Sequence, residues 1–238
     1  MLPEKTWKTE SVLRLLLGVF ATWSAGILLA TGISNLNLGW PESTTRLLSM
    51  VIITLTFHGA ALLWLNSFFK SENIFWAEAF GFNLPGRRRA VALALMAGLL
   101  VLPIAWGLQQ LTARIMTASH LNPEVQQVVQ ELQKGDVSPF QQTYLALVAL
   151  VAAPIVEEML FRGILYPTIK RAGFPKLALW GTSILFALTH QNAPAFFALV
   201  FLAMILTLLY EETGNLLAPI IAHSCFNTAN FVMLLHTK

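Results

Sequence analysis

The chain has 238 residues, of which 56% are hydrophobic and 11% are charged. An ordinary soluble domain carries about 25% charged residues, and much of its surface must stay hydrated. A soluble fold of this length cannot remove so much apolar surface from water, so the composition excludes a soluble globular enzyme, a disordered chain and a nucleic-acid-binding domain. The net charge of +3 is assigned to basic loops that face the cytosol. The lipid bilayer is therefore the expected surroundings of the chain.

Apolar runs predict an all-α polytopic membrane protein with about seven transmembrane helices, six or eight being the alternatives. A helix crosses the bilayer with about 20 apolar residues. The fifth and sixth runs are short, and the polar break at 191–194 between them predicts a tight helical hairpin. In chain order the runs are 11–33, 47–69, 90–111, 143–169, 177–192, 194–210 and 216–235.

The distribution of lysine and arginine predicts the orientation. With the N-terminus in the cytosol, ten basic residues lie inside and four outside, while Arg162 lies within a run and is set aside. This bias places the N-terminus inside and the C-terminus outside. Compact loops and short termini favour a prokaryotic cell (inner) membrane as the location of the protein.

Two segments are neither spans nor short loops. Residues 70–89 include Phe80 and Phe82 and suit a helix or loop that lies at the membrane interface. In the polar segment 112–142, Pro123 opens a predicted extracytosolic helix that runs to about residue 134. No second domain is expected. Residues 1–139 are expected to form N-terminal transmembrane helices with interfacial and extracytosolic segments, and 140–238 a helix core, within one continuous membrane domain.

Polar residues inside the apolar runs indicate function. A charged side chain at the bilayer centre costs about 2.5–3.5 kcal/mol on insertion scales, so such residues are expected to face the bundle interior or a wet cavity. Three runs carry them: Glu157, Glu158 and Arg162 in the fourth, His190 in the fifth, and His223 and Asn227 in the seventh.

Helical spacing predicts how these side chains are directed. Glu158 and Arg162 are four residues apart, so they share a face and can pair. Glu157 is displaced by about 100° and points to other neighbours. His223 and Asn227 are also four apart and share a face of their helix.

These residue types suit the hydrolysis of an amide bond. A buried carboxylate beside a histidine can hold and deprotonate a water molecule. A second histidine and an asparagine can donate hydrogen bonds to a developing oxyanion, and an arginine can fix a second carboxylate. The alternative is a structural polar network in a non-catalytic membrane partner or a transporter-like protein.

The sequence lacks the motifs of three other classes of intramembrane hydrolase. The H-E-x-x-H motif of metalloproteases is absent. An aspartyl protease needs two aspartates, but Asp136 is the only one in the sequence. The nucleophile turn of rhomboid-like serine proteases is absent, since residues 181–183 read Gly-Thr-Ser. A site built from glutamate and histidine remains.

The polar residues resemble three motifs of the CPBP family, which comprises CAAX-processing type II proteases and bacteriocin-processing, or Abi, proteins. The motifs occur in the family's order on successive spans, and the resemblance covers about residues 140–235. In chain order, Glu157-Glu158-Met-Leu-Phe-Arg162 resembles EExxxR, Phe186-Ala-Leu-Thr-His190 resembles FxxxH, and His223-Ser-Cys-Phe-Asn227 resembles HxxxN.

The resemblance implies an intramembrane endopeptidase of the glutamate type that acts on a membrane-associated or lipidated peptide or protein. No metal or other cofactor is expected, although two histidines and a glutamate could also ligate zinc. The implied roles are water activation for Glu157 and His190, an oxyanion hole for His223 and Asn227, support for Glu158 and Arg162, and substrate contact for Phe186.

Overall fold

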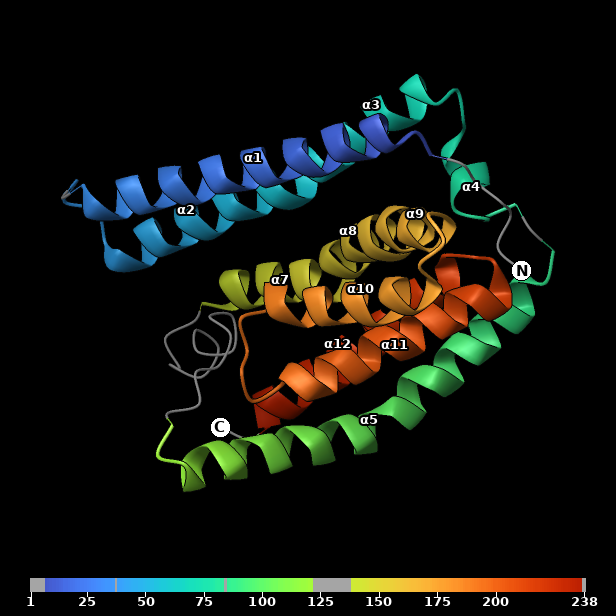
Figure 1. Cartoon of the computed structure of the whole chain (residues 1–238). Coiled ribbons are helices and arrows are strands. Elements are labelled where there is room, and N and C mark those ends of the chain that lie inside the picture. The colour runs from blue at the N-terminus through green and yellow to red at the C-terminus, as the bar shows by residue number, and fades with distance from the viewer. Residues whose placement is uncertain (1–6, 37, 84, 122–137, 237–238) are drawn as a thin grey trace. The chain divides into compact units, whose positions relative to one another are not determined.

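The computed structural model describes residues 7–36, 38–83, 85–121 and 138–236, and this part of the chain contains helices and no strand. The prediction of an all-α polytopic membrane protein is thereby confirmed. The helices group into two compact units, of which one is Trp7–Trp76 and the other is the described chain from Ala77 onward. Figure 1 labels the helices of both units.

Six of the described helices are long and apolar enough to cross a membrane. The fifth predicted run forms α10 (Pro175–Thr189), whose 15 residues extend about 22 Å, less than the ~30 Å of a hydrocarbon core. Six lies within the predicted range, and the exact count and the orientation stay predictions. The six are Thr9–Asn35, Glu42–Ser71, Arg87–Ala118, Pro139–Arg171, Phe196–Thr213 and Leu217–His236.

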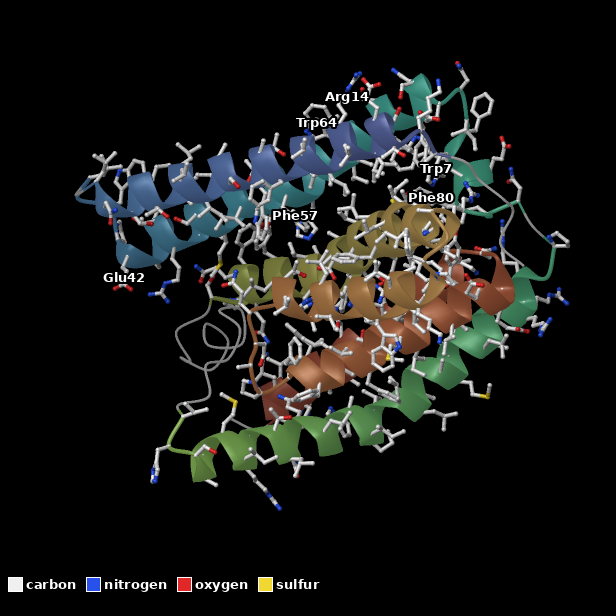
Figure 2. All side chains as sticks on the ribbon, in the orientation of Figure 1. Trp7, Arg14, Glu42, Phe57, Trp64 and Phe80 are labelled. Carbon is white, nitrogen blue, oxygen red and sulfur yellow. The ribbon has the colours of Figure 1, made fainter. Side chains whose placement is uncertain are left out.

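The first unit is a helical hairpin. α1 (Thr9–Asn35) packs along a second helix that consists of α2 (Glu42–Thr54), the π-helical turn η1 (Leu55–Gly59) and α3 (Ala60–Ser71). The Trp64 ring, which is labelled in Figure 2, lies directly against Gly18 of α1, where any side chain would collide with it. Small residues therefore allow the two helices to approach closely.

In the second unit, α5 (Arg87–Ala118) lies along α11 (Phe196–Thr213) and α12 (Leu217–His236), as Figure 1 shows. α10 packs on α11 and on the end of the long helix Pro139–Arg171. That long helix is continuous but not uniform, since two π-helical turns interrupt it. Its segments are α7 (Pro139–Leu147), η2 (Val148–Ala152), α8 (Ala153–Glu158), η3 (Met159–Leu165) and α9 (Tyr166–Arg171).

Local sequence signals explain where these helices begin and end. Ser138 and Gln141 form a capping box at the start of α7, with a proline between them at the first helical position. Gly173 and Gly214 adopt left-handed backbone angles, which only glycine adopts without strain, in the turns that follow α9 and α11. The turns reverse the chain and bring α10 and α12 back along the long helix.

The position of residues 70–89 at the membrane interface stays a prediction, but the structure shows what one of its aromatic side chains contacts. Among the described residues between α3 and α5, α4 (Trp76–Ala79) is the one helix, and Phe80, which follows it, is fully buried. The Phe80 carbonyl accepts a hydrogen bond from the Leu216 amide at 2.9 Å, and its ring fills the space beside Gly163. The segment therefore docks onto the helices that carry the motifs. The predicted helix at 123–134 lies outside the described residues.

Candidate active site

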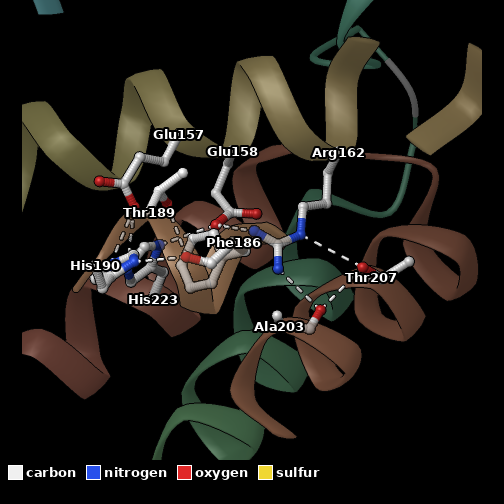
Figure 3. A network of polar contacts seen from close by, with 9 residues as sticks. All are labelled: Glu157, Glu158, Arg162, Phe186, Thr189, His190, Ala203, Thr207 and His223. Carbon is white, nitrogen blue, oxygen red and sulfur yellow. Dashed lines mark hydrogen bonds and ion pairs between the residues drawn. The ribbon is translucent and has the colours of Figure 1, made fainter. Parts of the chain in front are cut away.

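Three helical segments of the second unit bring five of the predicted polar side chains together (Figure 3). α8 and η3 carry the two glutamates and Arg162, His190 caps the C-terminal end of α10, and α12 carries His223. The π-helical turns η2 and η3 flank α8 on both sides. Such turns are rare and occur frequently at functional sites.

Glu158 and Arg162 form the predicted buried pair, which the structure confirms. The Arg162 Nη1 atom donates to Glu158 Oε1 at 2.8 Å, and the two side chains are 1% and 0% exposed. Because both charges are removed from solvent, each depends on the other for compensation. The face of the guanidinium also lies over the Phe186 ring, with 4.7 Å between Cζ and the ring centroid.

The same Glu158 oxygen contacts His223. The distance from His223 Nδ1 to Glu158 Oε1 is 2.9 Å, and both side chains are buried. An ionised carboxylate only accepts hydrogen bonds, so Nδ1 is the nitrogen that carries the proton. The other nitrogen, Nε2, is thereby turned toward Glu157, with 3.9 Å between Nε2 and Glu157 Oε2.

The orientation of His190 is fixed by its own helix. His190 Nδ1 lies 2.8 Å from the Phe186 carbonyl oxygen, which cannot donate, so Nδ1 is protonated and a neutral ring has its lone pair on Nε2. That nitrogen is 3.8 Å from Glu157 Oε2. Glu157 therefore faces two imidazole nitrogens, and its side chain is 15% exposed.

Asn227 lies one turn beyond His223 on α12 and makes a separate contact. Its Nδ2 atom donates to the Ala149 carbonyl of η2 at 2.8 Å. One amide hydrogen thus ties α12 to the helix that carries the glutamates, and an asparagine amide has a second hydrogen. The predicted share of Asn227 in an oxyanion hole stays a prediction.

The two glutamates, Arg162, His190 and His223 are called the polar cluster below. Phe186 lies beneath this cluster with none of its surface exposed. Its ring centroid is 4.6 Å from that of His190 and 5.5 Å from that of His223. A substrate could touch this ring only if its neighbours moved aside. The placement therefore favours a supporting role over the predicted substrate contact.

The sequence-based prediction missed Thr207 on α11, which is fully buried beside Arg162. Arg162 Nε donates to Thr207 Oγ1 at 3.4 Å, and Arg162 Nη2 donates to the Ala203 carbonyl at 2.9 Å. A hydroxyl within the apolar stretch of α11, which extends to Leu209, was the available signal, but threonine commonly bonds to its own helix and is inconspicuous there.

The expectation that the site needs no metal stays a prediction. Across the described ranges, no group of three or more histidine, cysteine, aspartate or glutamate side chains has the arrangement of a metal site.

Comparison with known proteins supports the resemblance. Residues 139–229 match the family described as type II CAAX prenyl endopeptidase Rce1-like. The matched segment contains all three motifs and every side chain of the polar cluster. No curated protein and no solved structure matches the chain.

Proposed function

We propose a reaction for this chain from the premise that residues 139–229 belong to the CPBP family of CAAX-type intramembrane proteases. In this proposal the chain is an endopeptidase that hydrolyses a peptide bond of a membrane-associated or lipidated protein. Glu157 and His190 activate water, and His223 and Asn227 bind the oxyanion.

The observation that carries the proposal is the spacing around Glu157. Its Oε2 atom is 3.8 Å from His190 Nε2 and 3.9 Å from His223 Nε2. These separations exceed a direct hydrogen bond and suit a water that bridges the carboxylate to an imidazole. The water oxygen attacks the peptide carbonyl carbon while Glu157 takes a proton, which then passes to the leaving amine.

His223 is the better placed of the two histidines to stabilise an oxyanion. To donate through Nε2 it must carry protons on both nitrogens, and Glu158 stabilises that form through Nδ1.

The family match supports a proposal for the substrate class. Its description names a CAAX prenyl endopeptidase, and we propose that this chain likewise acts on a peptide whose lipid holds it in the bilayer. A prokaryotic cell membrane is the proposed location. The competing function is a non-catalytic membrane partner, in which the same cluster only holds the helices together.

The purified chain in detergent should cleave a farnesylated CAAX peptide that carries a fluorophore and a quencher on either side of the scissile bond. We expect Glu157→Gln to lower turnover at least 100-fold, because general-base catalysis contributes about 10²–10⁴-fold. Glu212→Gln is the matched control, since Glu212 forms an exposed ion pair with Arg89 outside the cluster. Cleavage by Glu157→Gln within tenfold of the wild type would contradict the proposal.

The same assay with a chelator tests the zinc alternative. Because the described residues offer no three-ligand group, we expect 1,10-phenanthroline to leave turnover unchanged. A loss of activity that added zinc restores would assign the histidines to a metal instead.

A further inference from the structure

We propose that Thr207 is a positioning residue for the reaction. In this inference, α11 holds the Arg162 guanidinium in one orientation, and Arg162 in turn fixes Glu158 and His223. The inference rests on the proposed function, and Thr207 lies outside all three motifs.

The geometry of the guanidinium supports this role, because all three of its nitrogens have a partner on the described chain. Nη1 donates to Glu158, while Nη2 and Nε, which form one edge of the planar group, donate to Ala203 and Thr207. Figure 3 shows the edge turned toward α11. A bidentate contact of this kind restricts rotation, which a single hydrogen bond does not.

Thr207 is itself oriented to accept. Its hydroxyl donates to the Ala203 carbonyl at 2.9 Å, so its lone pairs remain available to Arg162 Nε. The two acceptors lie one turn apart on α11, and the helix fixes their separation. Because the Phe186 ring covers the guanidinium face, Arg162 is restrained at one edge and on one face.

The effect reaches the reacting groups through Glu158. One carboxylate oxygen, Oε1, receives both Arg162 Nη1 at 2.8 Å and His223 Nδ1 at 2.9 Å. If Arg162 tilts, this oxygen and the His223 ring tilt with it. Small displacements at a reacting centre reduce turnover more than they weaken the binding of substrate. Thr207 should therefore affect kcat and leave KM nearly unchanged.

A matched pair of valine substitutions tests the inference. Thr182 on α10 is the control, because it is 2% exposed and its hydroxyl donates to Ala178, four residues earlier, as that of Thr207 does to Ala203. We expect Thr207→Val to lower kcat about fivefold, Thr207→Ser to restore it, and Thr182→Val to leave it unchanged. Equal losses in the two valine variants would overturn the inference.

A second measurement does not depend on activity. Lysine at position 162 lacks the guanidinium edge, so Thr207→Val should lower the thermal unfolding midpoint in detergent less in an Arg162→Lys background than in the wild type. Additive shifts would overturn the inference. A chain that shows coupling but cleaves no peptide would instead contradict the proposed function and leave the contact established.

Discussion

Arg162 and His190 both belong to the predicted site, but the structure gives the two residues different surroundings. Arg162 is 1% exposed and its nitrogens are held by groups on two helices. His190 is 15% exposed, and its ring is held by the carbonyl of Phe186 in its own helix. Removing either should stop the reaction for a different reason.

We expect Arg162→Leu to lower activity and stability together. The substitution leaves the Glu158 carboxylate buried without its partner, which costs about 3–5 kcal/mol in soluble proteins. His190→Ala should lower activity with a smaller loss of stability. Thermal unfolding in detergent, measured beside turnover, separates the two effects. An Arg162→Leu protein with unchanged melting would mean that the pair contributes nothing to the fold.

The sequence predicted the members of this cluster better than the contacts between them. The charges within a predicted span and their separation by four residues indicated the Glu158–Arg162 pair, because both signals lie within one helix. Thr207 could not be found in this way, since its partner is 45 residues away on another helix. The direction in which Asn227 donates depends equally on how α12 packs against η2.

At the scale of elements, the contact between Phe80 and Gly163 joins a short non-motif segment to the helix that carries Arg162. The glycine has no side chain, and the Phe80 ring occupies the space that a Cβ atom would need. The Phe80 carbonyl also accepts a hydrogen bond from the backbone amide of Leu216, the residue before α12. The segment therefore secures two of the helices that form the site.

We expect Gly163→Ala to lower the unfolding midpoint, because overpacking a filled site costs about 1–3 kcal/mol. Gly181→Ala is the matched control, since the nearest atom to an added Cβ there lies at 3.4 Å, an ordinary contact, and alanine favours a helix. In a Phe80→Ala background the penalty at Gly163 should shrink. Equal effects of the two alanine substitutions would contradict the proposed collision.

Hydropathy located most helix ends to within five residues, as the run 216–235 and the helix Leu217–His236 illustrate, but α5 continues to Ala118, seven residues beyond the run 90–111. Lipid imposes this pattern on each span separately, so a single sequence reveals it. The burial of Phe80 did not follow from the sequence. An aromatic residue in a short segment between two spans can lie at a membrane interface or pack against neighbouring helices, and the sequence does not show that its ring faces Gly163.

At the scale of the whole molecule, the predicted orientation places the starts of α5 and α10 in the cytosol. Arg88 and Lys176 mark these ends, and both are exposed. Glu42 and Arg114 lie at the opposite ends of their spans and are exposed as well. The positive-inside rule concerns the charged loops that adjoin the spans, so the predicted orientation can be tested at each loop separately.

A chain with Cys225→Ala and one new cysteine at a time provides the test. We expect a membrane-impermeant maleimide to label positions 88 and 176 only from the cytosolic side, and 42 and 114 only from the outer side. Replacement of Cys225, the only cysteine in the sequence, removes the background. The reverse labelling pattern would overturn the predicted topology.

The end of α10 has a consequence for proton chemistry. A helix leaves its last carbonyls without backbone donors, and the Phe186 carbonyl accepts instead from the Thr189 hydroxyl and from His190 Nδ1. A carbonyl only accepts, so its contact with Nδ1 requires the proton there and leaves Nε2 as the ring nitrogen that can accept a proton. In enzyme design, a helical carbonyl four residues before a histidine could specify a tautomer in the same way, without any additional side chain.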